Sequence, residues 1–365
     1  MTDCLKKFDH WLINDGSTTP AALVIREYLM PVEGTDGVLF PPTYAAGDKF
    51  AGGYNIDGPS DGENVCLVDS VGSQANRIEP IFQSERYSKL VPQISVTAGD
   101  RSVSIFEAGH RAADALVRCS SLQAELEEAF KNVLKGSASS LARIAPTSLV
   151  FGVWDSRGTE AKLPRLIAST IRAINVRPLT RSAQFVPAAS YVDDGLLDDP
   201  EATGNKKDSK GMADAYAALG FIHIPASAKH GGVIASGGIR RDATLSIAAL
   251  RLLSERGDES QTMALRRYIL GISLVAFTHP SAFVGYLRQG CNLVRDPNRP
   301  HDCVEVHPNG QRKPFLLTAD EAFEFALKAA EAFGVGESKS VPFDKESAKR
   351  QVNGKIKEKS KAKAE

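Results

Sequence analysis

The sequence has no net charge and no long apolar run. Its 365 residues include 44 Lys plus Arg and 44 Asp plus Glu. The overall charge therefore favours neither a nucleic acid nor a membrane surface, and any basic surface must be local. No apolar stretch approaches the roughly 20 residues that a membrane-spanning helix needs. The first segment, MTDCLKKFDHWLIND, contains acids and lacks an apolar centre, so it does not have the pattern of a signal peptide.

Cysteines are few, odd in number and scattered along the chain. The five are Cys4, Cys66, Cys119, Cys291 and Cys303. This distribution favours reduced thiols over a disulfide framework, so we expect a cytoplasmic protein.

Sequence motifs for catalysis and for metal binding are also missing. The chain contains neither a G-x-S-x-G nucleophile elbow nor a G-x-x-x-x-G-K-[ST] phosphate loop. Cys291, His301, Cys303 and His307 lie within a short window but lack the spacing of zinc modules. The dipeptide His301-Asp302 has no accompanying ligand pattern that would make a phosphohydrolase site. We therefore predict no catalytic residue, no metal site and no cofactor.

Apolar patterns predict strands and helices that alternate irregularly. Strands are expected at residues 21–32, 94–99 and 149–154, and helices at 67–83, at 162–174 and after a glycine turn within 233–253. Residues 266–277 are predicted to be buried, Asn309-Gly310 to turn a hairpin, and Thr318 with Glu321 to form a capping box at the start of a helix. This pattern favours an α+β fold over a regular doubly wound sheet.

Two segments are rich in glycine and in acidic or other polar residues. Residues 32–64 and 186–211 are long for simple connections, and we interpret them as insertions into one domain that spans residues 1–337. Residues 338–365 are rich in lysine and poor in apolar side chains, which predicts a disordered tail.

Basic residues are concentrated around and after the stretch LVFGVWDSRG. Glu160 is the only acidic residue among six cations: Arg157, Lys162, Arg165, Arg172, Arg177 and Arg181. If residues 162–174 form a helix, its cations lie on one face and its isoleucines on another. Such a face suits the phosphates of a nucleic acid. The alternative is a solvated face whose arginines pair with acids elsewhere.

Two other segments add polar donors. SVGSQANRIE places Gln74 and Arg77 on a helix that has one apolar face. KHGGVIASGGIRRD contains His230, Arg240 and Arg241 together with glycines, which allow a backbone to approach a phosphate closely.

Several stretches occur together, in order, in a known family. They are FPPTYA with YNI (40–45 and 54–56), LVDSVGSQANRIE (67–79), GHRAADA (109–115), LVFGVWDSRG (149–158), TRSAQF (180–185), RRDATLSIAALRLL (240–253) and LVAFTHP with YLRQGCNLV (274–294). Over roughly residues 20 to 330, the chain resembles the type I-U (also called I-G) CRISPR-associated RAMP protein that forms the Cascade backbone, within the Cas-seven superfamily.

The resemblance implies an RNA-recognition-motif-like (ferredoxin-like) palm, with a βαββαβ core enlarged by long insertions. It implies that copies of the protein stack along one CRISPR RNA with other Cascade subunits, and that they leave the bases free to pair with target DNA. A protruding hairpin, the thumb, is expected to interrupt that pairing, and both 32–64 and 186–211 qualify. The sequence has no RNP-type aromatic motif, which argues against base stacking on the sheet.

We therefore predict a non-enzymatic RNA-binding protein that uses these side chains: Gln74, Arg77, Arg157, Lys162, Arg165, Arg172, Arg181, Arg240 and Arg241. Neutral net charge also suits head-to-tail assembly, in which acidic residues 193–201 contact a neighbour. One alternative is a RAMP-type endoribonuclease that processes CRISPR RNA with His110 or His230 as its general acid or base. Another is a scaffold without nucleic acid, whose arginines only pair with acids.

Overall fold

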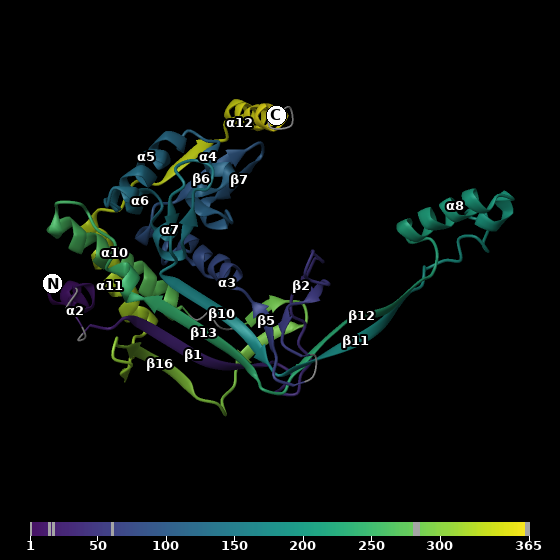
Figure 1. The fold of residues 1–365 in the computed structure, drawn as a ribbon, viewed down its shortest axis with the longest axis horizontal. Coiled ribbons are helices and arrows are strands. Elements are labelled where there is room, and N and C mark those ends of the chain that lie inside the picture. The colour runs from purple at the N-terminus through teal and green to yellow at the C-terminus, as the bar shows by residue number, and fades with distance from the viewer. Residues whose placement is uncertain (1, 14–15, 17–18, 60–61, 280–284, 362–365) are drawn as a thin grey trace.

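The computed structural model describes residues 2–13, 16, 19–59, 62–279 and 285–361. Its core runs in the order β1 (Ala22–Pro31), α3 (Val71–Ile78), β10 (Ile167–Ile174), β13 (Ile239–Ser246), α10 (Glu259–Thr278) and β15 (Cys291–Arg295). The four strands pair antiparallel in the order β15-β1-β13-β10 (Figure 1). The predicted α+β class is confirmed, and this βαββαβ arrangement is consistent with an RNA-recognition-motif-like palm.

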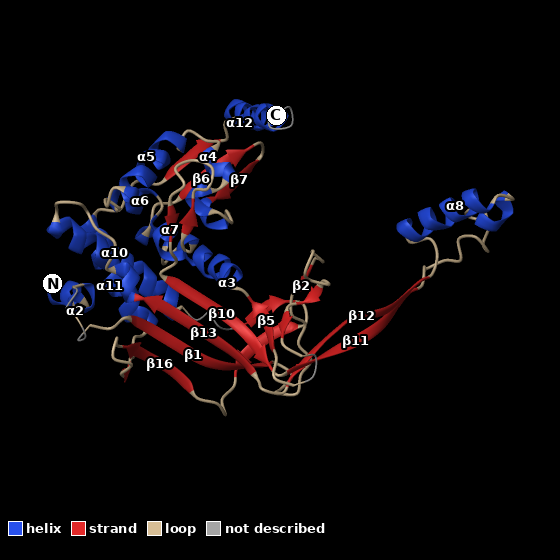
Figure 2. Cartoon of the chain, in the orientation of Figure 1, coloured by secondary structure: helices blue, strands red, loops and turns tan. Residues whose placement is uncertain are grey.

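The sheet has one covered and one uncovered face, because successive side chains of a strand point to opposite sides. On β1, Leu23, Ile25, Glu27 and Leu29 are buried, while Val24, Arg26 and Tyr28 are at least partly exposed. Figure 2 shows the helices gathered on one side of the sheet. There α3, α10 and α7 (Pro146–Phe151) form the main core with the sheet, and α11 (Ala319–Phe333) packs on α10. Within the described residues, no helix covers the other face, which we call the uncovered face.

Shorter strands extend the sheet at both edges. β5 (Val65–Asp69) pairs with β10, and β4 (Ile56–Asp57) pairs with β5. At the other edge, β14 (Gly285–Arg288) pairs with β15, and β16 (His301–Val306) pairs with both β1 and β17 (Arg312–Pro314). The β16–β17 hairpin turns at Asn309-Gly310, as predicted, where Gly310 has a φ of 84°.

A helical lobe stands on the covered face. Several predictions are confirmed there: residues 266–277 are buried in α10, and Thr318 and Glu321 form the capping box of α11. The remaining helices of the lobe are α1 (Thr2–Lys6), α2 (Asp9–Leu12), α4 (Ala115–Arg118), α5 (Gln123–Leu134), α6 (Ser139–Ile144) and α9 (Ile247–Leu250). Among the described helices, none has the length and apolar character needed to cross a bilayer.

The predicted disordered tail begins as ordered structure. β18 (Lys339–Pro342) pairs in parallel with β6 (Ile94–Ala98), whose other partner is β7 (Arg101–Ser104). Val341 and Phe343 pack against the core, and α12 (Lys345–Lys361) follows. The prediction of disorder is therefore wrong for this part of the tail, because two apolar residues anchor a lysine-rich segment. Residues 362–365 lie outside the described residues.

A long arm continues the two central strands. β11 (Val176–Phe185) follows β10, β12 (Ile224–Ala235) precedes β13, and the two pair antiparallel. At the tip lies α8 (Lys206–Leu219), none of whose residues is buried. In Figure 1 the arm and the helical lobe rise on the same side of the sheet. The protruding element therefore contains the predicted insertion 186–211, but it begins earlier, at residue 176.

The other predicted insertion, residues 32–64, lies at the root of the arm rather than protruding. It contains β2 (Thr43–Tyr44), β3 (Gly53–Tyr54) and β4, and residues 60–61 lie outside the described part. Leu39 bridges Val233 of β12, and the Tyr54 hydroxyl accepts a hydrogen bond from the Gly232 amide at 2.9 Å. This segment therefore fixes the arm to the palm.

Four predicted elements are wrong in type or extent. Residues 149–154, predicted as a strand, form the end of α7 and then β8 (Val153–Trp154), with Gly152 between them at a φ of 78°. Residues 162–174, predicted as a helix, form β9 (Lys162–Leu163) and β10. Arg240 and the residues up to 246 form a strand, and only Ile247–Leu250 are helical. The predicted helix at 67–83 is shortened to α3, between β5 and a 3-10 turn.

Candidate nucleic-acid interface

The predicted contact residues lie at four separate places. Gln74, Arg77 and Arg241 lie on the covered side of the sheet, where α3 packs. Arg172 and Arg240 are directly opposite each other on the uncovered face. Arg157, Lys162 and Arg165 precede β10, and Arg181 is on the arm. The sheet thus separates residues that the sequence pattern had placed together.

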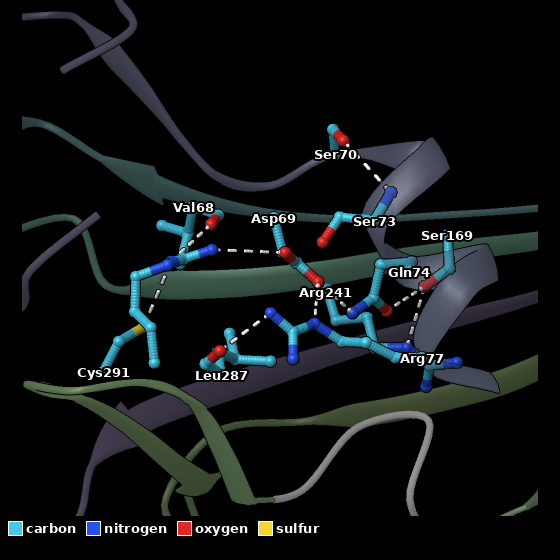
Figure 3. Close-up of polar contacts among 11 residues, drawn as sticks. Val68, Asp69, Ser70, Ser73, Gln74, Arg77, Ser169, Arg241, Leu287 and Cys291 are labelled. Atoms are coloured by element: carbon cyan, nitrogen blue, oxygen red, sulfur yellow. Dashed lines mark hydrogen bonds and ion pairs between the residues drawn. The ribbon is translucent and has the colours of Figure 1, made fainter. Parts of the chain in front are cut away.

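On the covered side, three polar side chains converge on the buried carboxylate of Asp69 (Figure 3). Gln74 Nε2 donates to it at 2.6 Å, Arg77 Nε at 3.1 Å, and an Arg288 guanidinium nitrogen at 3.4 Å. Ser70 caps α3 by accepting a hydrogen bond from the Ser73 amide. Because two arginines share one carboxylate, this end of α3 carries excess positive charge.

The same network continues under the sheet to a second buried carboxylate. The Ser169 hydroxyl donates to Gln74 Oε1 at 2.8 Å and accepts from Arg241 Nε at 3.0 Å. Arg241 also pairs with Glu27, which Arg295 contacts from the other side. The Arg241 side chain is 1% exposed and Gln74 is 2% exposed. Both are held inside the fold, so we leave them out of the proposed RNA contacts.

Five exposed cations differ from these paired arginines. They form no ion pair with an acid among the described residues, and they are Arg157, Lys162, Arg165, Arg177 and Arg181. Two of them lie near aromatic rings, with Lys162 Nζ 5.5 Å from the Trp154 ring and the Arg181 guanidinium 5.9 Å from that of Phe40. Exposed guanidinium and ammonium groups that lack an acidic partner are available to bind an external anion. In the scaffold alternative, all such groups would be paired with acids of the same chain.

Arg165 lies at the end of α7. A Cβ at Gly152 would come within 2.7 Å of Arg165 Cγ, so the glycine makes room for this side chain. The Gly152 carbonyl accepts from buried Arg111, whose Nε pairs with Glu79 at 2.6 Å. Burial, and then the charge of Arg111, lower the pKa of Arg165. Two guanidiniums and one carboxylate therefore give this spot a net positive charge.

The turn between β8 and β9 is held by Asp155. Asp155 is buried and accepts from both the amide and the hydroxyl of Thr159, at 2.7 and 2.9 Å. Gly158 lies against the Asp155 carboxylate, where a Cβ would collide with it. Arg157 is exposed, and it forms no ion pair with an acid among the described residues.

The root of the arm combines aromatic and basic side chains. The exposed His230 ring lies 4.9 Å from the Tyr54 ring and against Gly53, which has a φ of 96° and no Cβ to block the approach. Burial raises the pKa of Tyr54, while the hydrogen bond from the Gly232 backbone and the charge of Arg181 lower it. This is a common composition for surfaces that bind single-stranded nucleic acid.

One comparison with known families gives a match, over the first part of the palm and the start of the arm. Residues 23–178, from β1 to the beginning of β11, match the model of a family described as CRISPR-associated protein GSU0053. Over these residues, which make up less than half of its length, the chain is similar to a CRISPR-associated family. A search of curated proteins finds no match to it.

The histidines and other groups that could form an alternative chemical site are dispersed. His110 lies in the helical lobe, where its backbone amide donates to Asp114, whereas His230 is on the arm. In the described residues, no three His, Cys, Asp or Glu side chains are grouped as metal ligands would be. His301 faces Glu27 at 3.8 Å, and burial lowers the pKa of this histidine.

Sequence reasoning missed several residues of this interface. Asp69 directly precedes the cap of α3, and Arg288 reaches it from β14, more than two hundred residues away in the chain. The position of Asp69 before a polar helix start was a usable signal, but nothing in the sequence placed Arg288 beside it. Arg177 belonged to the basic cluster and was omitted from the predicted contacts.

Proposed function

We propose that this protein holds CRISPR RNA by its phosphates and does not cleave it. In this proposal it is a repeating backbone subunit of a type I-U (I-G) Cascade complex, of the RAMP class. Copies of the chain and other Cascade subunits are its protein partners, and the bases of the guide stay free to pair with target DNA.

The observation that carries the proposal is the set of five exposed cations without acidic partners. They occur from the β8–β9 turn to the root of the arm. The eight residues of β10, about 26 Å of strand, separate Arg165 from Arg177, the next cation of the set. In Figure 1 the helical lobe and the arm, which carry these cations at their bases, rise on the same side of the sheet. Contacts made by guanidinium and ammonium groups to phosphates are independent of sequence, as a guide-binding subunit requires.

The test measures affinity and RNA integrity together. Purified full-length chain is titrated against three labelled RNAs of equal length and unrelated sequence. We expect affinities within about threefold of one another and uncut RNA after long incubation, since phosphate contacts carry no base information. Strong preference for one sequence would contradict backbone binding. Cleavage that disappears in His110→Ala or His230→Ala would instead establish the endoribonuclease alternative.

A further inference from the structure

On the uncovered face of the sheet, the charged side chains lie in two rows that run across the strands. Antiparallel register places Arg26 of β1 opposite Asp242 of β13, and Asp242 opposite Thr170 of β10. Two residues along, Tyr28 is opposite Arg240, and Arg240 is opposite Arg172. All of these side chains point away from the helices, since their neighbours in sequence face the core.

The first row is electrically compensated. Arg26 Nε lies 3.7 Å from an Asp242 oxygen, and Arg240 Nε donates to the other at 2.9 Å. Asp302 of β16 is the cross-strand partner of Arg26 on its other side. This row therefore offers no surplus cation to an external anion.

The second row has like charges directly opposite each other. Arg172 faces Arg240 across the strand pair, and like charges directly opposite each other destabilise a sheet. Asp242 pairs with Arg240 but not with Arg172. Arg172 is exposed, and within the described residues its guanidinium makes one hydrogen bond, to the Thr170 hydroxyl at 2.6 Å. No acid among the described residues pairs with it.

A third arginine is fixed beside this row. The Arg299 guanidinium lies 3.5 Å from the centre of the Tyr28 ring and donates to the Gly237 carbonyl at 3.0 Å. Gly238, at a φ of 86°, has no Cβ, and one there would collide with this guanidinium. Arg299 is thus held in one orientation by a ring, a carbonyl and a glycine. We call Tyr28, Arg172, Arg240 and Arg299 the outer basic row.

We propose that the outer basic row binds the phosphates of a second, single-stranded nucleic acid, on the side of the sheet opposite the proposed guide path. Three guanidiniums on two adjacent strands and one turn can donate to successive phosphate oxygens, and an arginine fork matches a phosphate bidentately. The row ends where the arm begins, because Ala173 and Ile239 are the last paired residues before it.

An acidic protein surface is the competing occupant. Residues 193–201 at the arm tip include Asp193, Asp194, Asp198, Asp199 and Glu201, all exposed, so a second copy could place them on this row. The nucleic acid is favoured because the row is flanked by Asp242 and by Asp302. A flexible single strand can place individual phosphates on the arginines and keep its other phosphates away from Asp242 and Asp302. The acidic arm tip of a second copy would bring several carboxylates close to these two acids at once, and they would repel each other.

The experiment uses two strands that do not pair with each other. Full-length chain is saturated with unlabelled oligouridylate RNA, and labelled oligodeoxythymidylate is then titrated by anisotropy. We expect the loaded protein to bind the second strand. Arg172→Glu should weaken this binding about tenfold and reduce its salt slope by about 0.7 to 1.4, because the new glutamate also neutralises Arg240. Arg26→Gln, on the same face in the compensated row, is the matched control and should stay within twofold.

The outcomes separate this inference from the proposed function. Arg165→Glu should weaken the first strand and leave the second unchanged, while Arg172→Glu should do the reverse. If the RNA-saturated wild-type chain does not bind the labelled DNA strand, the inference is overturned, while the proposal that the chain binds guide RNA is unaffected. The inference is also overturned if Arg172→Glu weakens only the first strand. A third refuting result is unchanged binding of both strands with loss of self-association, which would assign the row to the acidic arm of a second copy.

Discussion

Charge reversal at Arg165 and Arg181 should change how RNA binding depends on salt. These two side chains lie near the two ends of the set of five exposed, acid-free cations. If each of the five neutralises one phosphate of a single strand, the slope of log affinity against log salt is about −3.5. Affinity then falls about a hundredfold between 50 and 200 mM salt.

The double variant Arg165→Glu, Arg181→Glu leaves three such contacts. Its slope should be about −2, and its affinity should fall only about twentyfold over the same salt range. Fluorescence anisotropy with a labelled RNA at several salt concentrations measures both values. Neither substitution removes an internal ion pair, and burial with a neighbouring guanidinium already lowers the pKa of Arg165, so we expect the fold to persist.

A matched control keeps the total charge change the same. Arg86 and Lys131 are exposed cations that pair with Asp320 and Glu127. Reversing both should leave the slope at about −3.5, because paired surface cations are not counted among the contacts. A slope that changes equally in both double variants would refute the assignment and indicate a response to net charge alone.

Three further predictions concern the fold. Replacing residues 186–223 by an Asn-Gly turn should change the free energy of unfolding by less than about 0.5 kcal/mol in urea, because no residue of α8 is buried. Arg111→Met should cost about 3–5 kcal/mol at pH 8 and less at pH 5. Burial raises the pKa of Glu79 from 4.5 to about 7 even though Arg111 acts to lower it. In the variant, a neutral Glu79 is tolerated at low pH, and the free energy of unfolding falls as pH rises above 4.5 through the folded-state pKa, because the buried carboxylate then becomes charged without a partner. Gly238→Ala should cost about 1–2 kcal/mol and lower the melting temperature, because its φ is 86° and the new Cβ meets Arg299.

Elements with local signals could be predicted from the sequence. The α11 capping box requires only Thr318 and Glu321, and the β16–β17 turn requires only Asn309-Gly310. Each depends on contacts within a few residues, so the local pattern fixes the result.

The error at β10 has a simple geometric cause. Leu163, Ile167 and Ile171 are four residues apart, a spacing that fits one face of a helix and also one face of a strand, since four is a multiple of two. The cations do not share this ambiguity. Arg165 and Arg172 are seven apart, which would bring them together on a helix. In the structure Arg165 lies in the connection between β9 and β10, whereas Arg172 lies on β10 and points to the uncovered face. A wrong period therefore produced one basic face where the structure has two.

The rest of the interface depends on contacts that are remote in sequence. Arg240 and Arg241 look equivalent as neighbours, yet the strand sends Arg241 to Glu27 in the core and Arg240 to the uncovered face. The α7 segment was ambiguous as a short apolar run, although Pro146 at its first turn is a helix signal. Pairing across the sheet, which decides these cases, cannot be derived from any local window.

The arm leaves the palm from one central strand and returns to its neighbour. Its two strands can therefore gain or lose residues in pairs without altering the register of β10 with β13, and each added pair lengthens the arm by about 3.3 Å per residue of rise. The ten residues of β11 correspond to about 33 Å of reach. The length of the arm can thus be changed one residue pair at a time, by evolution or by design, while the pairing of the palm strands stays the same.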